Sequence, residues 1–208
     1  DFSIIGSDGS DYMNLIFRRS SDEYDEYITG NITITLGDGI DSLGAARLKN
    51  GDSVDMGAGD DSIGLYATNS SGTPSYASLN LTKLDGGAGT DTLSFGNMGS
   101  QGSTELTLTG GGATNFENID GSGGDDIIRG DTSANVIRGD GGADTIYGGG
   151  GNDWLYFPES TTGGADLSLS LGGAVNFENL GGTSQAEKLT GDAGNNIIVG
   201  DDGEDSLY

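Results

Sequence analysis

Residues 121–156 divide into four blocks of nine: GSGGDDIIR, GDTSANVIR, GDGGADTIY and GGGGNDWLY. Each block opens with a glycine-rich segment, has Asp or Asn at its sixth position and has an aliphatic residue at its eighth. Similarity at a fixed period of this kind indicates a repeat architecture. The sixth residues are Asp126, Asn135, Asp144 and Asp153, and the eighth residues are Ile128, Ile137, Ile146 and Leu155.

The same register extends to both sides of this stretch. Further blocks begin at Gly6, Leu36, Arg47, Met56, Gly86, Gly112, Gly173, Gly182, Gly191 and Gly200. The sixth position of these blocks is again acidic or Asn. Its residues are Asp11, Asp41, Asp52, Asp61, Asp91, Glu117, Glu178, Glu187, Asn196 and Asp205.

One longer pattern occurs twice. TELTLTGGGATNFEN, which begins at Thr104, matches ADLSLSLGGAVNFEN, which begins at Ala165. Each copy leads into a run of blocks, so we predict three related modules, 6–85, 86–147 and 148–208, stacked as one continuous solenoid. The first module is the most diverged, and the third ends within an array. We therefore expect the chain to be a fragment of a larger protein.

The charge balance is strongly acidic. The 208 residues include 33 Asp and Glu against 8 Lys and Arg, a formal net charge of −25. Such a chain repels itself when it is compact, so we expect counter-cations to be part of the folded structure. Nucleic acid and anionic membranes are disfavoured as partners, because binding them needs clustered Lys and Arg.

The absence of Cys and His excludes disulfides, thiolate metal sites and histidine catalysis. No apolar run is long enough for a membrane span.

The nine-residue spacing predicts the fold. Six residues rich in Gly, Asp and Asn turn tightly, because glycine allows positive φ, and the last three residues form a minimal strand. The eighth side chain then points inward, while the seventh and ninth point outward. Two blocks make one coil of eighteen residues, so the predicted fold class is all-β, with two stacked parallel sheets joined by turns.

Turns eighteen residues apart should lie above each other along one edge, where they bring carboxylates and backbone carbonyls together. Six to eight oxygen ligands without nitrogen or sulfur suit Ca²⁺ better than Mg²⁺, which needs near-ideal octahedral geometry. The predicted stacked pairs are Asp126 with Asp144, Asn135 with Asp153, Glu117 with Asn135, Glu178 with Asn196, Glu187 with Asp205, and Asp41 with Asp61. The predicted ligands are all the sixth-position residues named above, with the carbonyls of Gly57, Gly59, Gly87, Gly89, Gly124, Gly142, Gly149, Gly151, Gly194 and Gly203.

The blocks resemble the RTX (repeats-in-toxin) nonapeptide G-G-x-G-x-D-x-U-x. The resemblance covers roughly half of the chain in strict register and implies a right-handed parallel β-roll that binds several calcium ions. It also implies secretion by a type I system, a place outside the cell or on a bacterial cell surface, and folding on meeting extracellular calcium. The chain departs from the pattern where Glu117, Glu178 and Glu187 replace Asp and where Asn135 and Asn196 lack the charge. We expect these sites to be weaker, or to close the ends of a block.

Several segments interrupt the register. Residues 32–36, 105–109 and 166–170 alternate in polarity and predict strands, and 65–83 predicts an inserted loop. The acidic stretch 18–30 has two interpretations, a solvated surface loop or an additional calcium site. The outward-facing aromatic residues are Tyr147, Trp154 and Tyr156. They have two interpretations, a ligand platform or a packing surface covered by an insertion.

A core of one aliphatic residue in nine is thin for a glycine-rich chain. Metal binding would then supply the folding free energy, so we predict that the chain is unfolded or loosely collapsed without calcium and folded with it.

Three classes of function can be compared. The first is a calcium-dependent structural or binding module, either the non-catalytic region of a secreted enzyme or toxin or a self-assembling S-layer or adhesin segment. Its expected partners are calcium, other copies of itself and cell-surface polysaccharide. An enzyme is disfavoured, because a catalytic acid needs a pocket that raises its pKa and calcium would keep these acids ionised. An ice-binding face is disfavoured, because the outward seventh positions form no Thr or Asn ladder; they are Ile127, Val136, Thr145 and Trp154.

Overall fold

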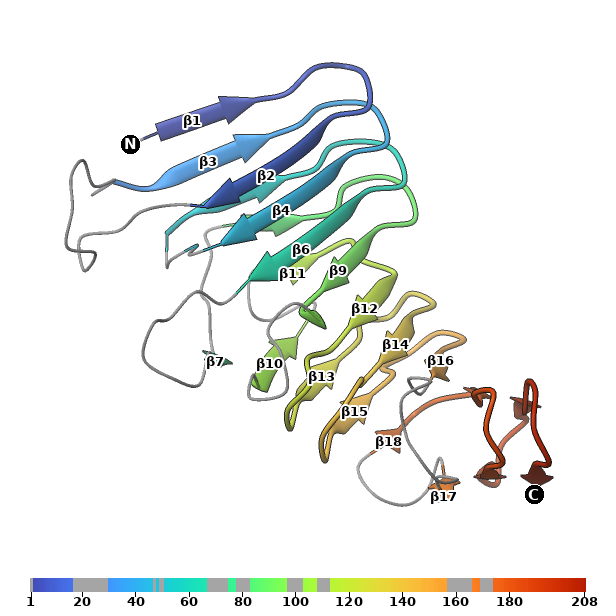
Figure 1. Ribbon diagram of the computed structural model, residues 1–208. Helices are drawn as coiled ribbons and strands as arrows, with labels where there is room; N and C mark the ends of the chain where they lie inside the picture. The colour runs from blue at the N-terminus through green and yellow to red at the C-terminus, as the bar shows by residue number, and fades with distance from the viewer. Residues whose placement is uncertain are drawn as a thin grey trace.

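The computed structural model describes residues 2–16, 30–46, 48, 51–66, 75–77, 83–96, 103–107, 113–156, 166–168 and 174–208. Short strands stack as successive coils of an all-β solenoid (Figure 1). The strands of the first half are β1 (Phe2–Ile5), β2 (Tyr12–Ile16), β3 (Ile32–Thr35), β4 (Ser42–Ala46), β5 (Ser53–Asp55), β6 (Ser62–Tyr66), β7 (Ser75–Ala77), β8 (Lys83–Asp85), β9 (Thr92–Ser94), β10 (Ser103–Thr107) and β11 (Ala113–Thr114). Those of the second half are β12 (Asn118–Asp120), β13 (Ile127–Arg129), β14 (Val136–Arg138), β15 (Thr145–Tyr147), β16 (Trp154–Tyr156), β17 (Asp166–Ser168), β18 (Ala174–Val175), β19 (Asn179–Gly181), β20 (Lys188–Thr190), β21 (Ile197–Val199) and β22 (Ser206–Leu207).

One side of the solenoid is a single continuous sheet. It runs through nine strands in the order β2-β4-β6-β9-β12-β14-β16-β19-β21. The opposite side consists of three shorter sheets, in the orders β1-β3-β5-β8-β11, β7-β10-β13-β15-β18 and β17-β20-β22. The paired strands are parallel. The predicted all-β class with stacked parallel sheets is confirmed.

The coils differ in length but keep one register. In the regular blocks Ile137 pairs with Leu155, eighteen residues later, as the spacing predicts. Nearer the N-terminus Met13 pairs with Leu43, and Leu43 pairs with Ile63. The eighth positions therefore still meet across coils of 30 and 20 residues. Insertions lengthen the connections without shifting the strands, because the entropy of closing a loop rises only slowly with its length.

The shorter sheets change at the two copies of the NFEN segment. β11, just before the first copy, ends one sheet, and β18, just before the second copy, ends the next. β10 and β17, which lie shortly before them in the chain, belong to the sheets that continue. The continuous sheet passes both places without a break. The division into modules 6–85, 86–147 and 148–208 itself remains a prediction.

The core is thicker in the first half than one residue in nine. Strand β3 places Ile32 and Ile34 inside and its threonines outside, because its alternating sequence buries two residues where a nonapeptide strand buries one. Phe116 and Phe177, from the two NFEN segments, are also fully buried. In the regular blocks the prediction holds, since the eighth residue is buried and its neighbours are partly exposed. The buried eighth residues of the continuous sheet are Leu43, Ile63, Leu93, Ile119, Ile137, Leu155 and Leu180.

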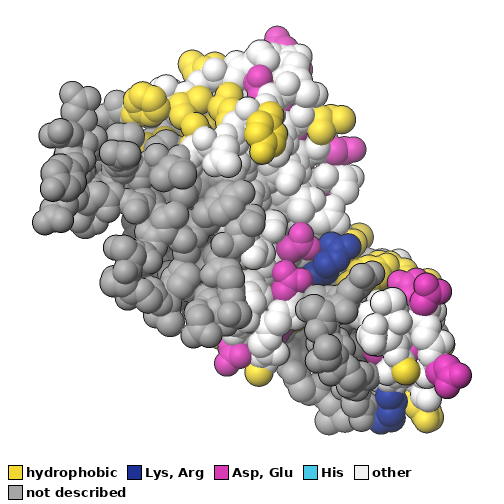
Figure 2. All heavy atoms as spheres, in the orientation of Figure 1, with side chains coloured by type: hydrophobic (Ala, Val, Ile, Leu, Met, Phe, Trp, Pro, Cys, Tyr) yellow, Lys and Arg dark blue, Asp and Glu magenta, His cyan; other side chains and the backbone are white. Residues whose placement is uncertain are grey.

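The first and last coils expose apolar side chains. Figure 2 shows hydrophobic side chains gathered at the end formed by β1, where Phe2, Ile5 and Tyr12 are exposed. Leu207 and Tyr208 are exposed at the other end. In a stack of parallel strands, the outermost coil has a neighbour on one side only, so its apolar residues are less covered than those of inner coils.

Close stacking of the turns requires glycine at specific positions, as the GGGGND segment shows. Gly149 has a φ of +108°, and a Cβ on it would lie 2.1 Å from the carbonyl oxygen of Asp131 in the preceding coil. Gly151 has a φ of +129° and faces the carbonyl oxygen of Ser133 in the same way, at 2.4 Å. Gly150, between them, is exposed, and its Cβ would meet no atom closer than 3.9 Å.

Gly149→Ala is expected to lower the free energy of unfolding by on the order of 3 kcal/mol, because it adds left-handed backbone strain and a clash with a backbone carbonyl. Gly150→Ala is the matched control and should change stability by less than about 0.5 kcal/mol. Thermal unfolding of both variants in saturating calcium measures the difference. Equal stability of the two variants would contradict the close approach of the turns.

Candidate metal centre

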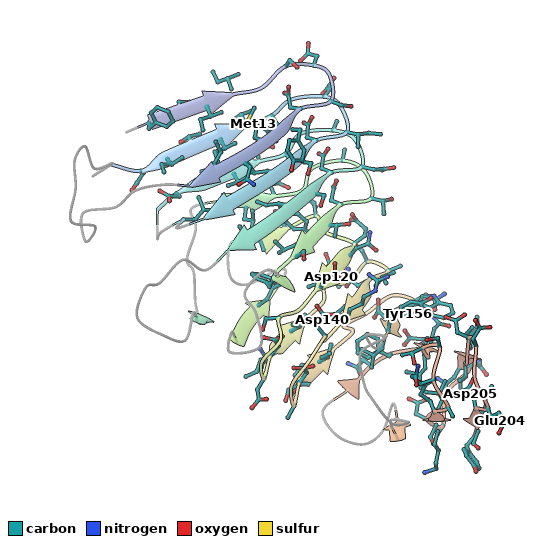
Figure 3. All side chains as sticks on the ribbon, in the orientation of Figure 1. Met13, Asp120, Asp140, Tyr156, Glu204 and Asp205 are labelled. Atoms are coloured by element: carbon teal, nitrogen blue, oxygen red, sulfur yellow. The ribbon has the colours of Figure 1, made fainter. Side chains whose placement is uncertain are left out.

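A repeated hydrogen bond joins the turns of successive coils. The backbone N–H of the sixth residue in one turn donates to the carboxylate of the sixth residue in the next. Asp11 donates to Asp41 at 2.7 Å, Asp41 to Asp61 at 2.8 Å, and Asp61 to Asp91 at 2.8 Å. The same bond joins Asp126 to Asp144 (2.9 Å), Asn135 to Asp153 (2.8 Å) and Glu187 to Asp205 (2.9 Å, Figure 3).

Four of the six predicted pairs are therefore brought together by this bond: Asp41 with Asp61, Asp126 with Asp144, Asn135 with Asp153, and Glu187 with Asp205. In the other two pairs, an Asn side chain reaches the backbone of an NFEN segment. Asn135 Nδ2 donates to the carbonyl of Phe116, and Asn196 Nδ2 to that of Glu178, both at 3.3 Å.

The two glutamates of the NFEN segments also contact the coil before them. Asp91 N–H donates to Glu117 Oε2 at 2.8 Å, and Asp153 N–H donates to Glu178 Oε2 at 2.9 Å. Each glutamate thus takes the place that the next turn's Asp occupies elsewhere. The sequence analysis missed these contacts, because 26 and 25 residues separate the partners. The occurrence of the NFEN motif at two places in the chain is the one sequence signal that could have indicated these contacts.

Asp52 lies just before β5, on the side of the solenoid opposite the sheet that contains β4 and β6. It is fully buried and accepts the backbone N–H of Ile32 at 2.9 Å, so it supports the sheet that contains β3 and β5. The proposed extra site in the acidic stretch falls on residues 17–29, which lie outside the described part of the chain.

Five turns are closed by a hydrogen bond within the turn. In each, the second residue donates its backbone N–H to the side chain of the sixth, four residues later. We call these the closed turns; the bonds are Ser7 to Asp11 (2.7 Å), Ser122 to Asp126 (2.6 Å), Asp131 to Asn135 (3.0 Å), Thr183 to Glu187 (3.2 Å) and Asp192 to Asn196 (2.9 Å). The hydroxyl groups of Ser122 and Thr183 donate to the same acids.

Six other turns among the described residues have a different backbone, with positive φ at both the second and the fourth residue. We call these the open turns; their second and fourth residues are Gly37 and Gly39, Gly57 and Gly59, Gly87 and Gly89, Asp140 and Gly142, Gly149 and Gly151, and Asp201 and Gly203. Their sixth residues are Asp41, Asp61, Asp91, Asp144, Asp153 and Asp205.

Four of the six open-turn acids carry orphaned oxygens. The Oδ2 atoms of Asp41, Asp61, Asp91 and Asp153 are buried and have no hydrogen-bond partner, and these four residues are at most 2% exposed. A buried carboxylate oxygen without a partner is strongly unfavourable. These oxygens therefore indicate a positively charged group that completes the turn.

Backbone carbonyls lie close to the same turns. The carbonyl oxygens of Gly57 and Gly59 lie only 1.8 and 1.9 Å from where a Cβ on Gly87 and Gly89 would be. The predicted carbonyl of Gly124 lies similarly against Gly142, at 2.6 Å. Non-glycine carbonyls that the sequence analysis missed occupy the equivalent place, namely those of Ser7, Asp131, Ser133 and Gln185.

The available metal ligands are therefore carboxylate and carbonyl oxygens, which are the ligands that Ca²⁺ prefers. No group of three or more acidic side chains that could hold a metal is found within the described ranges. A calcium ion here would depend on one or two carboxylates and on backbone carbonyls from the stacked turns. The residues present fit such an ion.

Burial raises the pKa values of four open-turn acids, Asp61, Asp91, Asp144 and Asp153. It raises the pKa of Asp144 to about 7 and the pKa values of Asp91 and Asp153 to about 6. The N–H group donated from the preceding coil lowers each pKa, while nearby carboxylates, such as Asp126 beside Asp144, raise it. With protein groups alone, ionisation of these acids therefore opposes folding. A cation would reverse this effect.

The predicted outward aromatic residues, Tyr147, Trp154 and Tyr156, are half-buried. The rings of Trp154 and Tyr156 are stacked, with centroids 5.4 Å apart. Arg138 lies over the Tyr156 ring at 5.5 Å and forms an ion pair with Asp120 at 3.0 Å (Figure 3). The insertion that follows Tyr156 lies outside the described residues, so the ligand platform and the covered packing surface both remain predictions.

Calcium-free protein is expected to gain folded structure as the pH falls from about 7 to about 4. The folded-state pKa values of Asp144 (about 7), Asp91 and Asp153 (about 6) exceed the ordinary value of 3.8, so the folded state binds more protons in this window. The stabilisation is complete below the ordinary pKa and is lost as the pH rises through the folded values. Far-UV circular dichroism in calcium-stripped buffer measures the gain.

Calcium-saturated protein is the control and should show no such gain, because the cation already compensates the acids. A calcium-free folded fraction that is equal at pH 7.5 and pH 4.5 would contradict the predicted pKa shifts.

A comparison with protein-family models agrees with this site. The RTX calcium-binding nonapeptide repeat matches in four copies, over residues 83–97, 120–155 and 181–208. A search of curated proteins found no match. The matched ranges contain both open and closed turns, including the stacked acids Asp126 and Asp144. The chain therefore carries RTX calcium-binding nonapeptide repeats at these residues.

Proposed function

We propose that this chain is a calcium-dependent structural module of a secreted or cell-surface bacterial protein, and that it folds when calcium binds. The observation that carries the proposal is the set of buried carboxylate oxygens without partners, on Asp41, Asp61, Asp91 and Asp153. Each would cost on the order of 1–3 kcal/mol or more if it stayed unpaired. Calcium neutralises the stacked carboxylates and replaces the missing hydrogen-bond donors.

The ligands that the geometry favours are the sixth-position carboxylates of the open turns, with carbonyls of the turn stacked below each. The other predicted side chains already form hydrogen bonds with protein groups. Their role as calcium ligands remains a prediction. They are Asp11, Asp52, Asp126, Asn135, Glu117, Glu178, Glu187 and Asn196.

Coupling between binding and folding follows from the charge. A chain with a net charge of −25 and stacked acids is opposed in folding by its own repulsion. An ion that binds only the folded state stabilises it by about 2.7 kcal/mol per site at a hundredfold excess over the dissociation constant. Several such sites along one stack add enough free energy to decide whether the glycine-rich turns are ordered.

The proposed location and export route follow from this coupling. A chain that stays unfolded at low calcium can be exported as an extended polypeptide by a type I system and can fold in a calcium-rich exterior. Within the described part of the chain, no helix has the length and apolar character needed to cross a membrane. We assign the segment no catalytic role, because its acids are committed to turn hydrogen bonds and to the cation. An S-layer or adhesin segment is a narrower role that the same module could serve.

Circular dichroism tests the proposed function. At pH 7.5 the β-sheet signal should be absent after chelation and should appear on calcium addition, with a midpoint on the order of 10⁻⁴–10⁻³ M. Magnesium at the same concentration is the control and should restore little of the signal, because it needs a tighter, octahedral ligand set. An unchanged β-sheet spectrum after chelation would refute the proposal.

A further inference from the structure

The open and closed turns follow a strict order along each stack. An open turn always lies on a preceding nonapeptide turn, as shown by the strand pairs β2-β4, β4-β6, β6-β9, β13-β15, β14-β16 and β20-β22. Among the described residues, a closed turn never lies on another open or closed turn. In the part of the chain that the structure describes, no turn lies below the one before β2, which is the edge strand of its sheet.

The other closed turns stand where the repeat has just been interrupted. The turns before β14 and β21 stack on strands β12 and β19, which follow the two NFEN segments. The turns before β13 and β20 stack on coils whose strands are β10 and β17. The residues that precede those two strands, 97–102 and 157–165, contain no nonapeptide block.

The identity of the sixth residue follows the same division. All six open turns have Asp there, whereas the closed turns accept Asp, Asn or Glu. Asn135 and Asn196 both lie in closed turns, where they accept the second residue's N–H through the amide oxygen at 3.0 and 2.9 Å. A carboxylate is therefore needed only where no donor from the same turn reaches the side chain.

Resting on the calcium-dependent function proposed above, we infer that the closed turns bind no calcium through their own sixth residue and are the metal-free starting turns of each calcium-loaded run. A hydrogen bond from the turn's second residue takes the place of the cation. The closed turn still presents its carbonyls to the following open turn, as Asp131 and Ser133 do toward Gly149 and Gly151.

The physical reason for this order of turns is the number of oxygen ligands that calcium needs. A calcium ion needs six to eight oxygens, and one turn alone cannot supply them, so the carbonyls of the turn below are required. Where no nonapeptide turn lies below, the acid would remain unpaired. The N–H of Ser122, at 2.6 Å from Asp126 Oδ2, and its hydroxyl, at 2.8 Å from Oδ1, satisfy that acid without a metal.

The inference assigns one calcium site to each of the six open turns in the described part of the chain. It removes Asp126 and Glu187 from the ligand set, although Asp126 fits the repeat in sequence. It also gives Glu117 and Glu178 a role that is not metal binding, since each ends a run by accepting the N–H of its last Asp.

The test counts bound calcium in two matched pairs of variants. In the first pair, Asp126→Asn and Asp144→Asn each remove one negative charge from two stacked turns, one closed and one open. In the second pair, Glu187→Gln and Asp205→Asn make the same comparison in the last coils. Equilibrium dialysis against saturating ⁴⁵Ca gives the ions bound per chain, and circular dichroism confirms folding. Asp144→Asn and Asp205→Asn should each bind one ion fewer than the unmodified chain, while Asp126→Asn and Glu187→Gln should bind the full number.

Loss of an ion in either closed-turn variant, or a full count in an open-turn variant, would overturn the inference. The pair in the last coils covers the case in which Asp144→Asn fails to fold, because a defect at Asp205 leaves the preceding coils intact. An unmodified chain that binds no calcium would instead refute the proposed function.

Discussion

The coils of this solenoid are joined at their turn edge by one repeated interaction, in which a backbone N–H donates to a carboxylate of the next coil. It links Asp41 to Asp61 and Asp61 to Asp91 at 2.8 Å. The bond holds each acid against the preceding turn, away from water. It therefore fixes the stacking of the coils and at the same time accumulates buried like charges. The positive-φ glycines and the orphaned oxygens are consequences of keeping acids in that position.

This interaction also explains how the fold tolerates irregular coils. The same bond forms between partners 18, 20 and 30 residues apart, because it depends on where the turns lie and not on the length of chain between them. At the NFEN segments, where Glu replaces the sixth-position Asp, Glu117 and Glu178 supply the acceptor. The core adapts in the same places by burying Phe116 and Phe177.

Two solutions to the buried acid coexist in the chain. In a closed turn, the protein satisfies the acid with its own N–H groups, so the turn can form without an ion. In open turns such as those of Asp91 and Asp153, the acid keeps an unpartnered oxygen and a raised pKa, so the turn depends on a cation or a proton. A run that begins with a closed turn and continues with open turns would order only when calcium is available.

The sequence alone determined the period, the parallel all-β class, the buried eighth position and pairs such as Asp126 with Asp144, because uninterrupted blocks repeat the same backbone every eighteen residues. Only the tertiary structure decided that Asp91 meets Glu117, since the path of the inserted residues between them is not encoded in the repeat. It also separated Ser122 from Asp140, two non-glycine second residues of which only Asp140 has positive φ (+62°). The difference depends on whether a turn lies beneath each one, and that neighbour belongs to a distant part of the chain.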